Sequence, residues 1–129
     1  MRAVPGPRLK GSRFGGVEPA NRLIDTHAHL DLPQFDRDRV RVIARARREG
    51  IGIITVGIDL ESSRKAVRLA KGYKVYAAVG IHPHEAKRYS KDLDEALRKL
   101  DELTEAERVV AIGETGLDYY RNLSPRQDQ

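Results

Sequence analysis

The stretch that decides the fold is Leu23-Ile24-Asp25-Thr26-His27-Ala28-His29, a short apolar run that ends in two histidines. Side chains at alternate positions of a strand face the same way, about 6.6 Å apart at a rise of ~3.3 Å per residue. His27 and His29 therefore point together and can close on one metal ion, although a single histidine here would be read as an ordinary surface residue. Asp25 shares their parity, so we expect its carboxylate to accept a ring N–H from one of them.

Three further apolar runs follow, at Ile51–Val56, Val75–Val79 and Val109–Ile112. They are nearly continuous rather than alternating, which is typical of strands buried on both faces of a parallel sheet. Amphipathic, charged stretches separate them. The predicted order is βαβαβαβ, with about four parallel strands in either an open sheet or a barrel.

The ends of the intervening helices can also be predicted. Asp36 is the expected N-cap of a helix through Arg48, which Gly50 ends. Asp59 is the expected cap of a second helix that stops near Gly72. The third helix is expected to open at Asp92, with Glu95 as its partner in a variant of the capping box.

The composition of the chain bears on its partners, its domain organisation and its localisation. The chain of 129 residues has a formal charge of +5, of which residues 1–22 carry +4, so we interpret the remainder as nearly neutral and uninformative about partners. Residues 1–22 are rich in glycine and proline and are expected to form a disordered basic leader, with one folded unit over 23–129. The lack of cysteine, of a membrane-length apolar stretch and of an apolar signal core predicts a cytoplasmic protein with no membrane partner.

Two more strands run into unusual polar chemistry. Val79 leads into Gly80-Ile81-His82-Pro83-His84, and Ile112 leads into Gly113-Glu114-Thr115-Gly116-Leu117-Asp118-Tyr119-Tyr120. The carboxyl ends of parallel strands form the usual place of a functional site. Glu114 directly follows an apolar strand, where a carboxylate is costly unless it is paired or bound to a cation, so it is the next ligand candidate.

These segments, with Ile24–Asp31 and Val56–Ser63, closely resemble the TatD-type metal-dependent deoxyribonucleases of the amidohydrolase superfamily. The resemblance covers Leu23 to Gln129. It implies a partial TIM (β/α)8 barrel, which the residue pattern alone did not distinguish from an open sheet. It also implies a hydrolase of phosphodiester bonds in DNA or a related substrate.

The resemblance implies His27, His29 and Glu114 as ligands of divalent metal, with Glu114 bridging two ions of Mg, Mn or Zn. His82 and His84 match a loop that contacts substrate phosphate or is merely structural. Asp118 matches a position that supports the site or closes its loop, and the residues from Tyr119 to Arg121 contact phosphate or pack.

The chain also departs from the family pattern. A TIM barrel has roughly 250 residues, and two further histidines and the aspartate that activates water are expected beyond Gln129. We expect a chain with this partial ligand set to be weak or inactive alone, and its open strand edges to allow self-association. The alternatives are a non-catalytic half-barrel interaction module and another amidohydrolase or PHP-type phosphoesterase, although Glu114 disfavours the latter pair.

Overall fold

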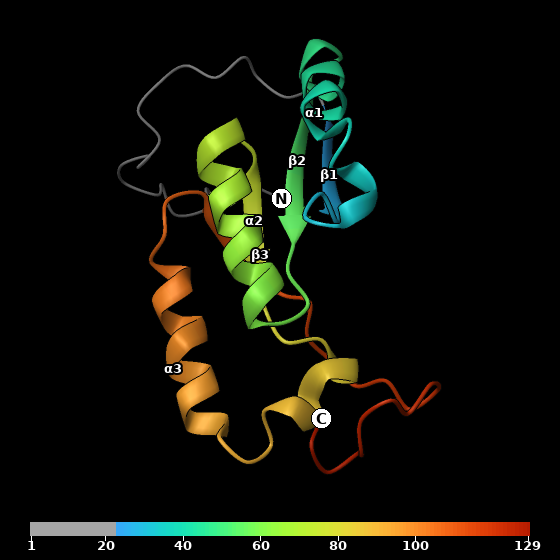
Figure 1. Cartoon of the computed structure of the whole chain (residues 1–129), viewed down its shortest axis with the longest axis vertical. Helices are drawn as coiled ribbons and strands as arrows, with labels where there is room; N and C mark the ends of the chain where they lie inside the picture. Colours follow the sequence, from blue (N-terminus) through green and yellow to red (C-terminus); the bar gives the residue numbers. More distant parts are fainter. Residues whose placement is uncertain (1–22) are drawn as a thin grey trace, which may run out of the picture.

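The structure is a computed structural model that describes residues 23–129 (Figure 1). The basic leader predicted over residues 1–22 lies outside the described residues. Strands and helices alternate as β1 (Leu23–Ala28), α1 (Arg39–Arg48), β2 (Ile51–Val56), α2 (Leu60–Tyr73), β3 (Tyr76–Val79), α3 (Leu93–Thr104) and β4 (Val109–Ile112). Two short 3-10 helices, η1 (Pro33–Phe35) and η2 (Pro83–Arg88), follow β1 and β3. The predicted βαβαβαβ order is therefore observed.

The strands form one parallel sheet in the order β1-β2-β3-β4. Apolar side chains between the sheet and the helices form the core. One cluster joins Ile43 of α1 and Ala66 of α2 to Ile53 and Ala77 of the central strands. A second cluster joins Leu100 of α3 to the end of β3. The three helices thus cover one face of the sheet, and they fix where the strands end.

The prediction that all four strands are buried on both faces is wrong for the outer two. Most of β2 and β3 is buried, whereas β1 and β4 are largely exposed. Leu23 is 67% exposed and Ile112 is 65% exposed. The reason is the strand order: β1 and β4 are the two edges of the sheet, and among the strands of residues 23–129 each has a neighbour on one side only.

Helix α2 has the predicted cap. The Asp59 carboxylate accepts the backbone N–H of Ser62 at 2.7 Å, and the Ser62 hydroxyl accepts the backbone N–H of Asp59 at 2.9 Å. These reciprocal bonds form a capping box. The helix ends at Tyr73, next to the predicted Gly72, and Lys74 adopts the left-handed conformation that closes it.

The predicted starts of the other two helices need correction. Pro33 begins a 3-10 turn that Asp36 closes with its backbone N–H, so α1 starts only at Arg39, and the Asp36 side chain instead pairs with Arg39 at 2.7 Å. Helix α3 does begin after Asp92, but no side-chain cap forms there. Its expected capping partner Glu95 pairs with basic residues of the next turn, so the capping box is wrong.

The strand ends are drawn together by close backbone contacts. A Cβ on Gly80 would lie 2.4 Å from the carbonyl carbon of Gly113, so only glycine fits there. The Gly113 N–H donates to Val79 at 2.9 Å, and the Glu114 N–H donates to Gly57 at 3.2 Å. These bonds bring the residues that follow β2, β3 and β4 together at the carboxyl end of the sheet.

Candidate metal centre

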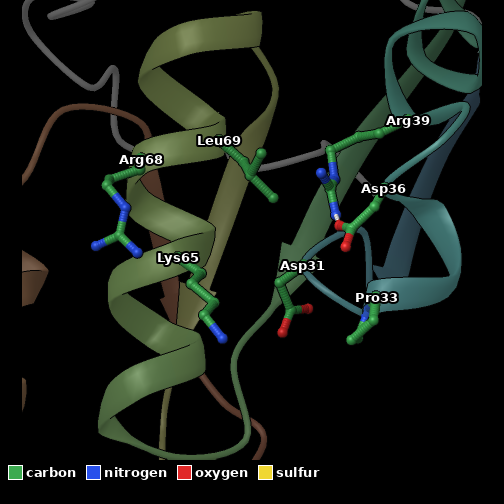
Figure 2. A pocket seen from close by; sticks show the side chains of 7 residues that line it. All are labelled: Asp31, Pro33, Asp36, Arg39, Lys65, Arg68 and Leu69. Carbon is green, nitrogen blue, oxygen red and sulfur yellow. Dashed lines mark hydrogen bonds and ion pairs between the residues drawn. The ribbon is translucent and has the colours of Figure 1, made fainter.

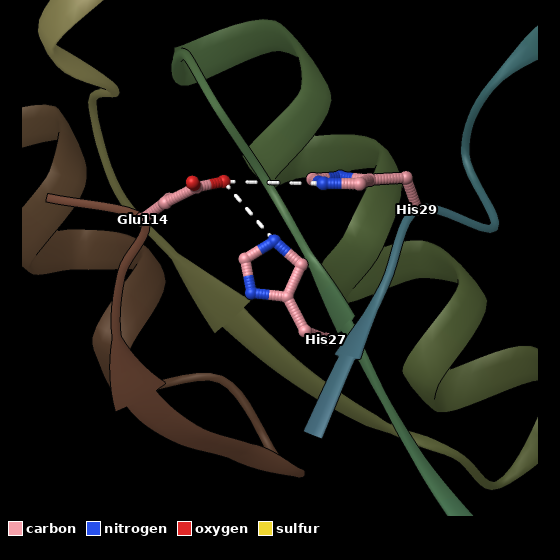
Figure 3. Close-up of side chains that lie close together, drawn as sticks. All are labelled: His27, His29 and Glu114. Atoms are coloured by element: carbon pink, nitrogen blue, oxygen red, sulfur yellow. Dashed lines mark ion pairs between the residues drawn. The ribbon is translucent and has the colours of Figure 1, made fainter. Parts of the chain in front are cut away.

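His27, His29 and Glu114 converge at the carboxyl ends of the two outer strands (Figure 3). Their ligand atoms all lie within 4.8 Å of one another. The Glu114 Oε2 atom is 3.3 Å from His27 Nε2 and 3.9 Å from His29 Nε2. The carboxylate and His29 are partly buried, and His27 is more exposed. Two imidazoles and one carboxylate form a donor set that suits Zn²⁺ and other divalent transition metals.

The orientation of His29 is fixed from behind. Its Nδ1 lies 2.9 Å from the carbonyl oxygen of Val56. Because a carbonyl can only accept, Nδ1 must carry the proton, and the lone pair of Nε2 is then free on the side that faces Glu114. This is the arrangement in which a hydrogen-bonded imidazole serves as a metal ligand.

Asp25 does not take the position that strand parity predicts. Its carboxylate accepts the backbone N–H of His27 at 3.1 Å, and within residues 23–129 it contacts neither ring nitrogen of the pair. The register of β1 against β2 shifts between Asp25 and Ala28, which breaks the simple alternation. The Val56 carbonyl therefore holds the tautomer of His29 in place of the expected carboxylate.

His82 faces the other oxygen of the candidate ligand. Its Nε2 lies 3.4 Å from Glu114 Oε1, while its Nδ1 accepts the backbone N–H of His84 at 3.1 Å. An Nδ1 that accepts leaves the proton on Nε2 in the neutral ring, directed at the carboxylate. His82 is thus placed to orient Glu114 rather than to bind metal through the same nitrogen.

His84 and Asp118 lie one step further from the cluster. The Asp118 carboxylate accepts the Nε2–H of His84 and the backbone N–H groups of Arg121, at 3.0 Å, and Tyr120, at 2.9 Å. The Arg121 N–H, followed by His84, lowers the pKa of Asp118 to about 2. The ring of His84 packs edge-on against the ring of His82 at 4.2 Å. The pair is therefore in contact with the residue that faces Glu114.

The loop after β4 closes through residues that the sequence analysis did not single out. The Gln129 side chain accepts the Asp118 N–H at 2.7 Å and donates to the Ser124 carbonyl at 2.8 Å. The buried Ser124 hydroxyl donates to the His84 carbonyl at 2.7 Å. No composition or spacing signal distinguishes Ser124 and Gln129, because their role depends on a loop that folds back over 40 residues of sequence.

The tyrosines and arginine that follow Asp118 are not brought to the cluster. Tyr120 is 92% exposed, and the Tyr119 ring lies 4.3 Å from the guanidinium of Arg126.

Within the described residues no helix is both long and apolar enough to cross a membrane.

A family profile and individual relatives resemble this chain. The sequence profile described as TatD related DNase matches residues 24–129. A protein of Musicola paradisiaca named 3'-5' ssDNA/RNA exonuclease TatD is 44% identical over 110 residues, which are 83% of this chain and 40% of that protein. The uncharacterized metal-dependent hydrolase YabD of Bacillus subtilis is 42% identical over 109 residues, which are 83% of this chain and 42% of that protein.

A crystal structure gives the likeness in three dimensions. The TatD homolog YjjV of Escherichia coli K12 matches with a TM-score of 0.67 and 35% identity, over 78% of this chain and 39% of that one. The four parallel strands with their helices are thus a partial α/β barrel of the TatD type. The chain spans about two fifths of the length of the relatives that it matches.

Proposed function

Because this chain belongs to the TatD-related DNase family, we propose that it provides the metal-binding part of a hydrolase that cleaves phosphodiester bonds in nucleic acid. The observation that carries the proposal is the convergence of His27, His29 and Glu114 from the first and last strands on one point. Relatives named as ssDNA/RNA exonucleases and as a metal-dependent hydrolase support it.

Each residue has a defined part in this proposal. His27 and His29 would each bind the ion through Nε2, and Glu114 through Oε2. When bound, such an ion lowers the pKa of a coordinated water and neutralises charge on the phosphate. His82 would hold Glu114 in place by donating Nε2–H to Oε1. No aspartate belongs to the ligand cluster formed by the described residues, so the group that takes the proton from water is expected elsewhere in a complete site.

We also propose that Mg²⁺, Mn²⁺ or Zn²⁺ is the metal and that a complete site holds two ions. Three protein ligands are enough for one ion with water in the remaining positions. Glu114 supports a second, because a carboxylate can bridge two ions while only one of its oxygens faces both histidines. A cytoplasmic location stays a prediction from the sequence.

Metal titration tests the proposal directly. The loss of the free-ion EPR signal measures Mn²⁺ binding to the full chain. We expect this binding to weaken by tenfold or more in the His27→Ala and Glu114→Gln variants. Glu107→Gln is the matched control, because Glu107 is an exposed carboxylate outside the cluster. Equal binding by all four proteins would contradict the site and would favour the non-catalytic interaction module.

We further propose that the open edges of the sheet take part in association. β1 and β4 expose Leu23, Ile24, Val110 and Ile112, each at least 45% accessible. Paired edges would cover these side chains and satisfy the free backbone groups of the outer strands. Sedimentation velocity tests this. A concentration-dependent dimer that is lost in Ile112→Lys supports it, and a monomer at every concentration would contradict it.

A further inference from the structure

The charges of the chain are segregated in space, although they nearly cancel over residues 23–129. Residues 37–74, which contain α1 and α2, hold eleven Lys and Arg against four Asp and Glu, a net charge of +7. Residues 75–129, which contain α3, have a net charge of −3. The near-neutral total that the sequence analysis interpreted as uninformative therefore conceals a strongly basic region.

The basic side chains of this region lie on the outer surface of two neighbouring helices. Arg41 and Arg48 are seven residues apart and share the exposed face of α1, and Arg64 and Arg68 are four apart on the exposed face of α2. None of the four makes a hydrogen bond or an ion pair with any residue between 23 and 129. We call these four side chains the basic face.

A cleft of about 290 Å³ lies between α2 and the segment that leads from β1 into α1 (Figure 2). Arg39, Lys65 and Arg68 line it together with two carboxylates. Asp36 is neutralised by Arg39 at 2.7 Å. One oxygen of Asp31 is buried without a partner among the described residues, and the three basic side chains of the lining outnumber its two carboxylates. The carboxylates therefore offset the positive charge of the cleft only in part.

The two helices that carry the basic face begin beside the candidate metal centre. Arg39, the first residue of α1, donates through Nε to the Leu30 carbonyl, directly after His29. Ile58, which precedes the N-cap of α2, contacts the loop that carries His82: its carbonyl oxygen accepts the His82 N–H at 2.8 Å. Both helices thus begin beside the loops that carry the ligands and run away from them with arginines on their outer side.

The chemistry of this surface favours a phosphodiester chain over a membrane. A helix that binds in a membrane interface needs a broad exposed apolar face. On α1, Ile43 is 4% exposed and Val42 packs against the core, which leaves Val40, at 58%, as the one exposed large apolar side chain of that helix. Arginine pairs well with phosphate oxygens. Arg41 to Arg48 spans about 10 Å at 1.5 Å per residue, the length over which one strand of B-DNA carries about three phosphates.

We propose that the basic face of α1 and α2 binds the sugar-phosphate backbone of a single-stranded nucleic acid whose end lies at the metal centre. The inference rests on the proposed function and adds a binding surface outside the ligand cluster. Binding there is electrostatic and independent of sequence, because the basic face offers guanidinium groups and no aromatic side chain.

The test measures binding of a fluorescent oligothymidine to the full chain by anisotropy, in EDTA, from about 50 to about 200 mM salt. Two variants each remove two charges, Arg41→Gln with Arg48→Gln, and Arg64→Gln with Arg68→Gln. The matched control, Lys87→Gln with Lys91→Gln, removes two exposed charges before the acidic helix α3 that, like the test arginines, form no ion pair among the described residues. Because single strands release about 0.7 counterion per phosphate contact, each test variant should lower the slope of log K against log salt by about 1.4.

The expected result is binding about tenfold weaker at low salt in both test variants, with the control unchanged. Equal losses in all three variants would overturn the proposal, because net charge alone would then explain binding. Tighter binding to phosphatidylserine vesicles than to the oligonucleotide would overturn it in favour of a membrane surface. EDTA keeps this test separate from the metal titration, so a failed metal site and a failed basic face give different results.

Discussion

The buried hydroxyl of Ser63 is expected to hold the loop that carries His82. It is fully buried, it accepts the Gly80 N–H at 3.1 Å and it donates to the Gly80 carbonyl at 3.2 Å. Ser63→Ala would leave two buried backbone groups without partners, at about 1–3 kcal/mol each, and a better helix former recovers a few tenths. The free energy of unfolding should therefore fall by about 1.5–5.5 kcal/mol.

Urea unfolding measures this loss. With an m-value of about 2 kcal/mol/M, the midpoint should drop by about 1–3 M. Ser90→Ala is the control, because the Ser90 hydroxyl is exposed and donates to a single carbonyl, that of Lys87 at 3.1 Å, so its effect should stay within about 0.5 kcal/mol. If Ser63→Ala unfolded as the control does, the two bonds to Gly80 would not contribute to the stability of the loop.

Three further predictions follow from the same region. His82→Phe removes the donor to Glu114 and should weaken Mn²⁺ binding by about tenfold, whereas an unchanged affinity in the EPR titration would refute the orienting contact. Gly80→Ala should destabilise the chain because its Cβ meets backbone, while Gly72→Ala, whose Cβ meets nothing within 4 Å, should stabilise it by up to about 1 kcal/mol in urea unfolding. Asp118 has a pKa lowered to about 2 in the folded state, so its contribution to stability is complete above its unfolded pKa of roughly 4 and is lost as the pH falls through 2. The difference in the free energy of unfolding between wild type and Asp118→Asn should accordingly be constant from pH 5 to 7, begin to fall below about pH 4 and vanish near pH 2. A difference that grew in acid would contradict the lowered pKa of Asp118.

The alternation of strands and helices and the position of the candidate ligands could be predicted from local features of the sequence. Short apolar runs that alternate with charged, amphipathic stretches indicate the strands of a parallel sheet. The carboxyl ends of parallel strands lie at the same end of that sheet. His27, His29 and Glu114 follow from that rule, because each comes directly after or at the end of a strand. The Asp59 cap was predictable for the same reason, since capping depends only on neighbours in sequence.

Three other features were not predicted. The parity of β1 fails at Asp25 because its register against β2 shifts, which no residue of β1 signals. Asp36 is a good N-cap residue, but Pro33 starts a competing 3-10 turn three residues earlier. The clustering of basic residues on α1 and α2 was hidden because net charge was counted over the whole folded part of the chain.

The position of the ligands at opposite edges of the sheet makes an ion a cross-link. His27 lies in β1, His29 directly follows it and Glu114 follows β4, with β2 and β3 between the two outer strands. An ion held by all three ties β1 to the segment that follows β4, across more than 80 residues of sequence. Any flattening of the sheet must then break a metal bond. At a hundredfold excess over the dissociation constant, such an ion would add about 2.7 kcal/mol to the stability of the curved form.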